Sequence, residues 1–322
     1  MQKRIVVLGG VGLIGTHLCL RLLREGHEVF CVDVRGIDHS PLLREALRYD
    51  RFRFIRHNIT SGFGIRCDQI YNLASPICLG YDKAMPVEIL KVNIAGSLNT
   101  LETARAEHAR VLFASSGDIS AISRRDSLSE ESYYNTVATI LGEAKRSAEA
   151  LHRAYRIEYG TDARIARVFN TYGPGCDIGD RRAVVRMSVA ALRNSEIIIY
   201  GSGEQTRTFC WVEDTVDGLV RLMNAPAEIK HSAMNFGGTQ EISVRELAEL
   251  IIELTGSRSR IRHVETRYND LHRKTPDISV ARRELKWAPT VSLDEGLKRT
   301  IGYIEAMMPK VGYTARTWVE VH

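Results

Sequence analysis

The sequence lacks several features that would place the chain in a particular class. No apolar run approaches the ~18 residues that a membrane-spanning helix needs. The apolar stretch Ile5–Leu8 near the start is too short for the core of a signal peptide, and glycines follow it at once. No internal repeat or low-complexity segment is present. We therefore expect a chain without a membrane span, and a cytoplasmic location is the default.

Metal-binding, disulfide and nucleic-acid patterns are also missing. None of the six cysteines stands in a CxxC or other metal-ligand spacing, so we expect reduced, mostly buried thiols and no metal site. The net charge of +5 is spread along the chain, without the basic stripe and interleaved aromatics of a nucleic-acid-binding surface. A mildly basic enzyme that acts on anionic substrates fits this composition better.

The 322 residues, 44% of them hydrophobic and 26% charged, suffice for two lobes with a large core. In the first half, short β-branched runs alternate with helical patterns near 13–25, 87–107 and 140–158. This alternation predicts an α/β fold, a doubly wound parallel sheet with helices on both faces. The predicted strands are Ile5–Leu8, Val29–Val32, Arg53–Ile55, Gln69–Leu73, Val111–Ala114 and Ala163–Val168.

The pattern of predicted helices and strands changes after residue 170, where a loop-like segment with three glycines leads into shorter elements. We predict a nucleotide-binding domain over residues 1–170 and a smaller mixed lobe over 171–322, with helices near 243–255 and 292–306. The boundary is not clean, because a helix over Val212–Met223 is expected to return to the first domain, within about 212–236. Asp214 is expected to cap that helix.

The helix over 87–107 carries Leu90, Ile94, Leu98 and Leu101 on one face. The helix over 140–158 carries Ala144, Ala148, Leu151 and Tyr155 in the same way. The simple interpretation is that both faces cover the sheet.

A glycine-rich turn follows the first strand directly, as Gly9-Gly10-Val11-Gly12-Leu13-Ile14-Gly15. Glycines at this spacing, between a strand and a helix, let the backbone turn tightly and approach a pyrophosphate, which the helix N-terminus then binds. The acid expected about twenty residues later is Asp33, at the end of the next strand, where it would bind a ribose hydroxyl and repel a 2′-phosphate. The cofactor is therefore predicted to be NAD, although Arg35 lies nearby. The expected cofactor contacts are Gly9, Gly12, Leu13, Ile14, Asp33, Leu73 and Ala74.

With these residues in view, the chain resembles the extended short-chain dehydrogenase/reductases, in particular the UDP-glucuronate decarboxylase branch of the epimerases and dehydratases. The resemblance runs from about residue 4 to residue 306. The segments that carry it are Leu73–Pro76, Lys91–Asn93, Arg167–Pro174, Tyr200–Arg207 and Pro276–Ile278.

The resemblance implies catalysis by a Ser/Thr, a Tyr and a Lys, the last two spaced YxxxK. Ser116 falls at the Ser/Thr position and Lys145 at the Lys, which would also hold the nicotinamide ribose. Asp118 falls where the decarboxylases carry a Glu, and is the candidate acid/base.

The Tyr position holds Leu141, which accepts no proton. Three interpretations stay open. Another group, such as Tyr133, Tyr134, Asp118 or Lys145, serves as base; the substrate brings its own base or needs a different group; or the protein binds its ligands without turnover. Further departures from the family pattern are Asn58, Ser120 and Gly175.

The resemblance also places basic and polar residues on the substrate side, where a guanidinium binds diphosphate oxygens in pairs. These are Asn170, Arg182, Arg207 and Lys274, which stands where the family has Arg. A nucleoside-diphosphate sugar, with UDP favoured, is the predicted substrate, and oxidation at the sugar C4 is the predicted chemistry. A silent NAD- and sugar-nucleotide-binding protein and a one-way dehydrogenase are the alternatives. A homodimer through a four-helix bundle of helices 87–107 and 140–158 is expected by analogy.

Overall fold

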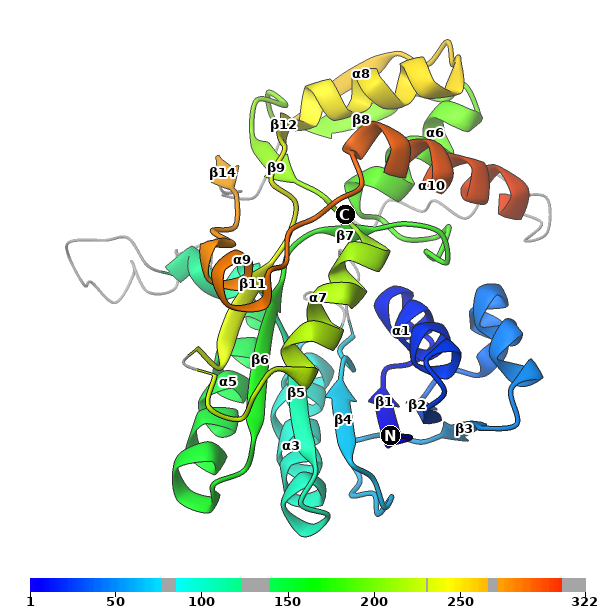
Figure 1. Ribbon diagram of the computed structural model, residues 1–322. Coiled ribbons are helices and arrows are strands. Elements are labelled where there is room, and N and C mark those ends of the chain that lie inside the picture. Colours follow the sequence, from blue (N-terminus) through cyan, green and yellow to red (C-terminus); the bar gives the residue numbers. More distant parts are fainter. Residues whose placement is uncertain (77–84, 123–138, 230, 266–271, 309–322) are drawn as a thin grey trace.

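Seven parallel strands form the centre of the molecule, in the order β11-β6-β5-β4-β1-β2-β3 (Figure 1). They are β1 (Arg4–Leu8), β2 (Glu28–Asp33), β3 (Phe52–Arg56), β4 (Gln69–Asn72), β5 (Arg110–Ser116), β6 (Ala163–Val168) and β11 (Ala233–Phe236). This is a computed structural model, and it describes residues 1–76, 85–122, 139–229, 231–265 and 272–308. The predicted doubly wound α/β sheet is confirmed, and its predicted strands all lie in it.

Helices cover both faces of this sheet (Figure 1). On one face, α1 (Leu13–Arg24) and α7 (Val212–Asn224) lie side by side and share a core with β1 and β2. On the other, α3 (Pro86–Ala106) and α5 (Ile140–Tyr159) pack on each other and on the sheet. Because both faces are covered, the central strands read as continuous apolar runs, as in the fully buried residues Ile5–Leu8.

A pair of arginines ties α7 to the sheet. Arg164 of β6 is fully buried and donates to the carbonyls of Leu222 and Pro226, at the end of α7. Arg110 of β5 donates to the carbonyls of Met223 and Ala225, and both guanidiniums pair with Asp162. Cations at a helix C-terminus satisfy its free carbonyls, so this cluster fixes where the chain leaves α7 for the central sheet strand β11.

The second lobe is built from α6 (Ala183–Leu192), α8 (Val244–Thr255) and α10 (Leu293–Met307), around a core of their own. Ser243 and Glu246 form a capping box at the start of α8, and Gly256 ends it in the left-handed conformation. Short strands complete this lobe: β7 (Thr171–Tyr172) with β10 (Cys210–Trp211), β8 (Ile197–Tyr200) with β13 (Ile261–Val264), and β9 (Thr206–Thr208) between β12 (Glu241–Ser243) and β14 (Arg273–Lys274). The remaining helix, α9 (Ser279–Leu285), packs near β11 and α7.

Two interpretations of the sequence are wrong in part. Leu90, Ile94 and Leu98 of α3 are exposed and only Leu101 is buried, so this stripe does not cover the sheet, whereas Ala144, Ala148 and Tyr155 of α5 are buried. Asp214 is not the cap of α7, because Trp211 stands at that position. The Asp214 carboxylate instead accepts hydrogen bonds from Thr290 and the Val291 N–H, which fix the loop before α10.

Five of the cysteines lie in the described residues, and all five are buried free thiols, as expected; Cys78 lies outside them. Among the described helices, none is long and apolar enough to cross a membrane.

Candidate active site

The glycine-rich turn lies where the order of the sheet reverses, between β1 and its neighbour β4. Gly9 has φ of 76°, a left-handed conformation that favours glycine. A Cβ on Gly9 would stand 2.8 Å from the backbone of Ala74 and 2.9 Å from Leu73, which follow β4. The turn is therefore pressed against the end of β4, and the crevice at such a reversal is where doubly wound sheets bind dinucleotides.

The start of α1 is arranged for an anion. Gly12 is its N-cap and offers no side chain, so the first N–H groups of the helix, on Leu13 and Ile14, point out of its end. Gly15 lets the helix pack against the turn, because a Cβ there would stand 2.3 Å from the Gly9 carbonyl oxygen. No other residue type fits at Gly9 and Gly15 without displacing backbone.

Asp33 closes the same crevice from β2. Its buried carboxylate accepts hydrogen bonds from the Val11 N–H (3.0 Å) and the Arg35 N–H (3.0 Å). These bonds hold the carboxylate at the mouth of the turn and leave each oxygen a second lone pair. The turn, the bare helix end and the carboxylate together fit the pyrophosphate and ribose of NAD, and their assignment to the cofactor stays a prediction.

A second cluster forms at the carboxyl end of β5, where two lobes meet. The Ser116 hydroxyl donates to Asp118 (2.8 Å), in the short helix η3 (Gly117–Ile122), and the Lys274 ammonium donates to the other oxygen of the same carboxylate. Lys274 and Arg207 stand opposite each other in the β14–β9 pair, so both side chains leave the same face of that sheet. Residues from β5, β9 and β14 thus meet around one carboxylate.

Electrostatics keep Asp118 ionised. Burial acts to raise the pKa of this carboxyl, but the charge and hydrogen bond of Lys274, the Ser116 hydroxyl and the charge of Arg207 outweigh it. The pKa therefore lies below its ordinary value. An anion this well compensated is a weak base, which bears on its proposed role.

Lys145 lies one turn into α5 and is buried. Its ammonium donates to the Ala114 carbonyl of β5 (2.7 Å) and lies over the Phe113 ring, 4.7 Å from the centroid. Burial lowers the pKa of Lys145 to about 7, against the opposing charges of Asp118 and Glu149. Near neutral pH the side chain is therefore divided between ammonium and amine.

Leu141 lies in the first turn of α5, one helical turn before Lys145, and is half-buried. The backbone of that turn lies against η3, since a Cβ on Gly142 would stand 3.3 Å from the Asp118 carbonyl oxygen. The first turn of α5, which holds Leu141, thus packs against the backbone of η3. Tyr133 and Tyr134, the candidate substitutes for the missing phenol, lie outside the described residues.

The two remaining substrate candidates have partners within the protein. The Asn170 amide donates to the Thr208 carbonyl (3.0 Å), which links β6 to β9. Arg182, at the N-cap of α6, donates to Asp180 (2.7 Å). Asn170 thus contacts the residue that follows Arg207, whereas Arg182 pairs with a carboxylate of the loop just before its helix.

A comparison with models of protein families matches residues 5–237 to the NAD dependent epimerase/dehydratase family. The chain belongs to this family. The match covers β1 through β11, which includes the glycine turn, Asp33, Ser116 and Lys145.

Curated relatives within this family extend the likeness over almost the whole chain. UDP-glucuronic acid decarboxylase 1 of Xenopus tropicalis is 38% identical over 307 residues, which are 94% of this chain and 72% of that protein. UDP-glucuronic acid decarboxylase 6 of Arabidopsis thaliana is 38% identical over 305 residues, 92% of this chain and 87% of that protein. The homologues are thus UDP-glucuronic acid decarboxylases.

Solved structures agree on the fold. A UDP-glucose 4-epimerase from Thermotoga maritima, solved with UDP-glucose, superposes with a TM-score of 0.82 at 26% identity, over 94% of this chain and 99% of that one. An epimerase from Methanothermobacter thermautotrophicus gives a TM-score of 0.84 at 26% identity, over 96% and 94% of the two chains. The architecture of this epimerase/dehydratase chain is therefore that of its family.

Sequence reasoning missed one part of the site, a buried network behind β5. The Glu149 carboxylate accepts hydrogen bonds from Ser115 (2.6 Å) and from two nitrogens of Arg167 (2.9 and 2.8 Å). A signal existed, because Glu149 stands four residues after Lys145 on one helix and Ser115 precedes Ser116.

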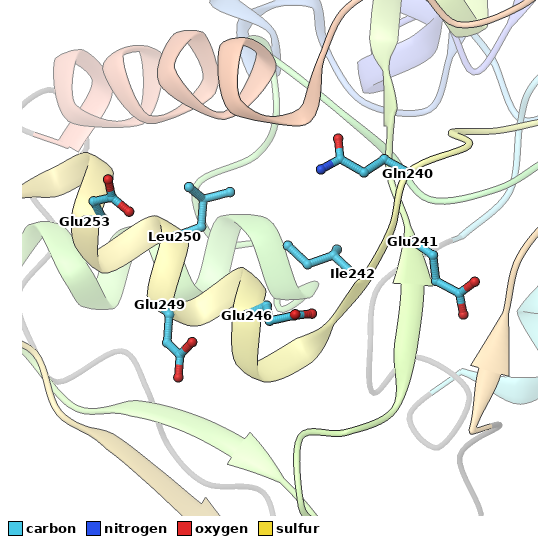
Figure 2. A pocket seen from close by; sticks show the side chains of 7 residues that line it. All are labelled: Gln240, Glu241, Ile242, Glu246, Glu249, Leu250 and Glu253. Atoms are coloured by element: carbon cyan, nitrogen blue, oxygen red, sulfur yellow. The ribbon is translucent and has the colours of Figure 1, made fainter.

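A shallow surface depression lies beside α8 and contains several carboxylates. It is lined by side chains of α8, of β12 and of the residue before β12, most of them acidic or apolar (Figure 2): Gln240, Glu241, Ile242, Glu246, Glu249, Leu250 and Glu253. The carboxylates in Figure 2 point in different directions and do not converge on a ligand position. Glu241 is paired with Arg273, whose side chain leaves the sheet on the face opposite to Lys274. We assign no chemistry to this depression.

Proposed function

We propose that the chain is an NAD-dependent enzyme that modifies a nucleoside-diphosphate sugar through oxidation of its C4 hydroxyl, with UDP-glucuronate as the first substrate to test. The observation that carries this proposal is the meeting of Arg207 and Lys274 with Ser116 and Asp118 at the carboxyl end of β5. Two cations on one face suit the diphosphate and carboxylate of such a substrate. The curated relatives, named UDP-glucuronic acid decarboxylases, support the choice of sugar.

The cofactor site is assigned to residues of the first domain. The backbone from Gly9 to Gly12, with the N–H groups of Leu13 and Ile14, would hold the pyrophosphate, and Leu73 and Ala74 border it. Asp33 would accept hydrogen bonds from a ribose hydroxyl and disfavour a 2′-phosphate. When bound there, NAD supplies reversible hydride acceptance from a sugar carbon.

The chain's own groups orient the sugar and manage its proton. Ser116 would hydrogen-bond the hydroxyl that is oxidised, while Lys145 holds the nicotinamide ribose and supplies a positive field. Asp118, ionised and compensated by Lys274, accepts a proton weakly but orients Ser116 well. Arg207 would bind the diphosphate, and Asn170 and Arg182 would line the nucleotide after rearranging their present contacts.

Leu141 favours a second candidate function. Leu141 replaces the phenol that the family's YxxxK pattern places four residues before Lys145, so a protein that binds NAD and a sugar nucleotide without turnover is the alternative. Retention of Ser116, Asp118 and Lys145 around one site supports an enzyme instead.

Incubation of the pure protein with NAD and UDP-glucuronate, followed by mass spectrometry and absorbance of the nicotinamide, decides between these functions. A product lighter by the mass of carbon dioxide, with NAD unchanged, is the expected result. Stoichiometric formation of NADH would indicate a one-way dehydrogenase. Binding of both ligands by calorimetry, without any new product from a panel of UDP-sugars and with no isomer resolved by chromatography, would establish the silent binder.

A homodimer is part of the proposal. Three exposed apolar residues of α3, Leu90, Ile94 and Leu98, form a stripe one turn apart from each other, and Val87 continues it. Since α5 packs beside α3, two copies of this helix pair would form a four-helix bundle that covers the stripe.

A further inference from the structure

Three titratable residues face the sheet from α5, where apolar side chains are the rule. Lys145, Glu149 and His152 follow each other at four and three residues, and each is no more than 2% exposed. Burial of ionisable groups is costly unless each has a partner. Each of these three groups is therefore expected to have a specific partner inside the protein.

Each residue of the stripe meets a different residue of β5. The Lys145 ammonium donates to the Ala114 carbonyl, the Glu149 carboxylate accepts from the Ser115 hydroxyl, and the His152 ring stacks on Phe113, with 4.7 Å between ring centroids. The three partners are consecutive in β5, and the next residue is Ser116. One face of α5 thus holds the end of the strand that carries the reacting serine.

Glu149 is the anion of this stripe. Burial acts to raise the pKa of its carboxyl, but the hydrogen bonds of Arg167 and Ser115 outweigh it, and the pKa lies below the ordinary value. Arg153 also approaches the carboxylate, at 3.8 Å. Glu149 therefore remains ionised inside the protein. Burial lowers the pKa of its neighbour His152 to about 4, so that imidazole is neutral near pH 7.

The two negative charges that act on Lys145 have different surroundings. Two anions act on its ammonium, Asp118 and Glu149. Asp118 is shared with Lys274 and Ser116 on the substrate side, so its field changes whenever a substrate displaces those partners. Glu149 is buried behind β5, where Arg167 and Ser115 hold its carboxylate, so none of its hydrogen-bond partners is a proposed substrate ligand.

We propose that Glu149 is a positioning residue of this site: it fixes the carboxyl end of β5 through Ser115 and supplies a negative charge that balances the Lys145 ammonium. The effect on turnover rests on the proposed function, whereas the effect of Glu149 on the charge of Lys145 does not depend on it. A carboxylate four residues further along a helix favours the charged form of a lysine. Without it, less of Lys145 carries the proton near neutral pH.

The direct test is the titration of Lys145 by NMR, in protein labelled with ε-¹³C lysine and assigned with Lys145→Arg. Glu149→Gln keeps the shape and a hydrogen-bond acceptor for Ser115 but removes the charge. We expect the titration midpoint of Lys145 to fall by about one pH unit in this variant. In Glu149→Asp, which keeps the charge, the titration midpoint of Lys145 should stay close to its native value.

Two further variants separate charge from position. Glu143→Gln removes a carboxylate from the same helix, two residues before Lys145, and should leave the midpoint unchanged. Ser115→Ala keeps the Glu149 charge and removes its hydrogen bond to β5, so it should also leave the midpoint unchanged but lower turnover by about tenfold, with little change in KM.

The outcomes are distinguishable from a failure of the proposed function. If no variant turns over any UDP-sugar, the midpoint shift in Glu149→Gln still supports the electrostatic role. A folded Glu149→Gln protein whose Lys145 titrates at the native midpoint would overturn that role. Native turnover in Ser115→Ala, with an unchanged pH profile, would overturn the positional role. If Glu149→Gln does not fold, Glu149→Asp and Ser115→Ala carry the tests: both keep the negative charge, so a Lys145 midpoint that falls by a full pH unit in either variant would contradict the assignment.

Discussion

Lys274 and Asp118 are joined by a hydrogen-bonded ion pair, although 156 positions separate them in the chain. Lys274 belongs to β14 of the second lobe and Asp118 to η3, at the end of a Rossmann strand. The pair therefore bridges the two parts of the molecule at the proposed substrate position. It also explains why Asp118 is ionised and why a substrate anion would compete for Lys274.

Removal of Lys274 tests the substrate side. Lys274→Met takes away the cation offered to the substrate and raises the pKa of Asp118. We expect the affinity for UDP-glucuronate to fall about ten- to a hundredfold, equivalent to ~1.5–3 kcal/mol for a hydrogen bond to a charged group. Titration calorimetry in the presence of NAD measures this. Lys298→Met, at an exposed pair on α10, is the matched control, and equal affinities in both variants would remove Lys274 from the site.

The glycine turn gives a prediction for stability and cofactor binding together. In Gly15→Ala the new methyl meets the Gly9 carbonyl oxygen at 2.3 Å, so backbone must shift. We expect a loss of about 1–3 kcal/mol in the free energy of unfolding and weaker NAD binding. Denaturant unfolding and cofactor fluorescence report the two effects. Gly62→Ala, whose Cβ meets nothing within 4 Å, should match the native protein, and the prediction is wrong if the two variants behave alike.

The low pKa of Lys145 predicts how stability depends on pH. The pKa is about 7 in the folded protein and 10.5 ordinarily, so between these values the unfolded chain holds a proton that the folded chain has released. The free energy of unfolding therefore gains up to ~1.4 kcal/mol for each pH unit across this window, and the gain is absent below about pH 7. In Lys145→Met this contribution disappears, and the curve from urea unfolding should be flatter than that of Lys298→Met. Parallel curves would contradict the buried titration.

Leu141→Tyr tests whether the missing phenol limits catalysis. A tyrosine at this position in the first turn of α5 would stand one turn from Lys145, whose charge lowers a phenol's pKa. We expect product formation from UDP-glucuronate to rise by about 10²–10⁴, the usual contribution of a placed general base. Leu141→Phe supplies the ring without the hydroxyl, so the same gain in both variants would exclude proton transfer as its cause.

The stripe on α3 predicts the assembly state. Ile94→Glu places a charge at its centre, which is 36% exposed in one chain and would be buried in a four-helix bundle. We expect sedimentation velocity to show a dimer for the native chain and a monomer for this variant, because an unpaired buried charge is strongly unfavourable at an interface. Leu47→Glu adds the same charge at an exposed position of η2 (Pro41–Arg48) and should leave the dimer intact. A native monomer would refute the proposal.

The sequence by itself determined the parts of this protein that depend on neighbours in the chain. The alternation of apolar runs, the spacing of glycines from Gly9 to Gly15 and the position of Asp33 after β2 are local patterns, and they specify a parallel sheet with a dinucleotide turn. The family pattern added Ser116 and Lys145 by position. Local pattern failed at α3, where Leu90, Ile94 and Leu98 have the spacing of a buried face but are exposed, since periodicity does not state which surface a face meets.

Only the tertiary structure decided which charges meet. Lys274 reaches Asp118 because β14 pairs with β9 in the register that sets it opposite Arg207, and this pairing joins residues far apart in the chain. Glu149 became part of the site because β5 and β6 bring Ser115 and Arg167 to one face of α5, where burial makes an ionised carboxylate dependent on both. Asp214 likewise binds a loop 76 positions away instead of capping its own helix. Charge in a protein interior depends on distant partners, because water no longer compensates it.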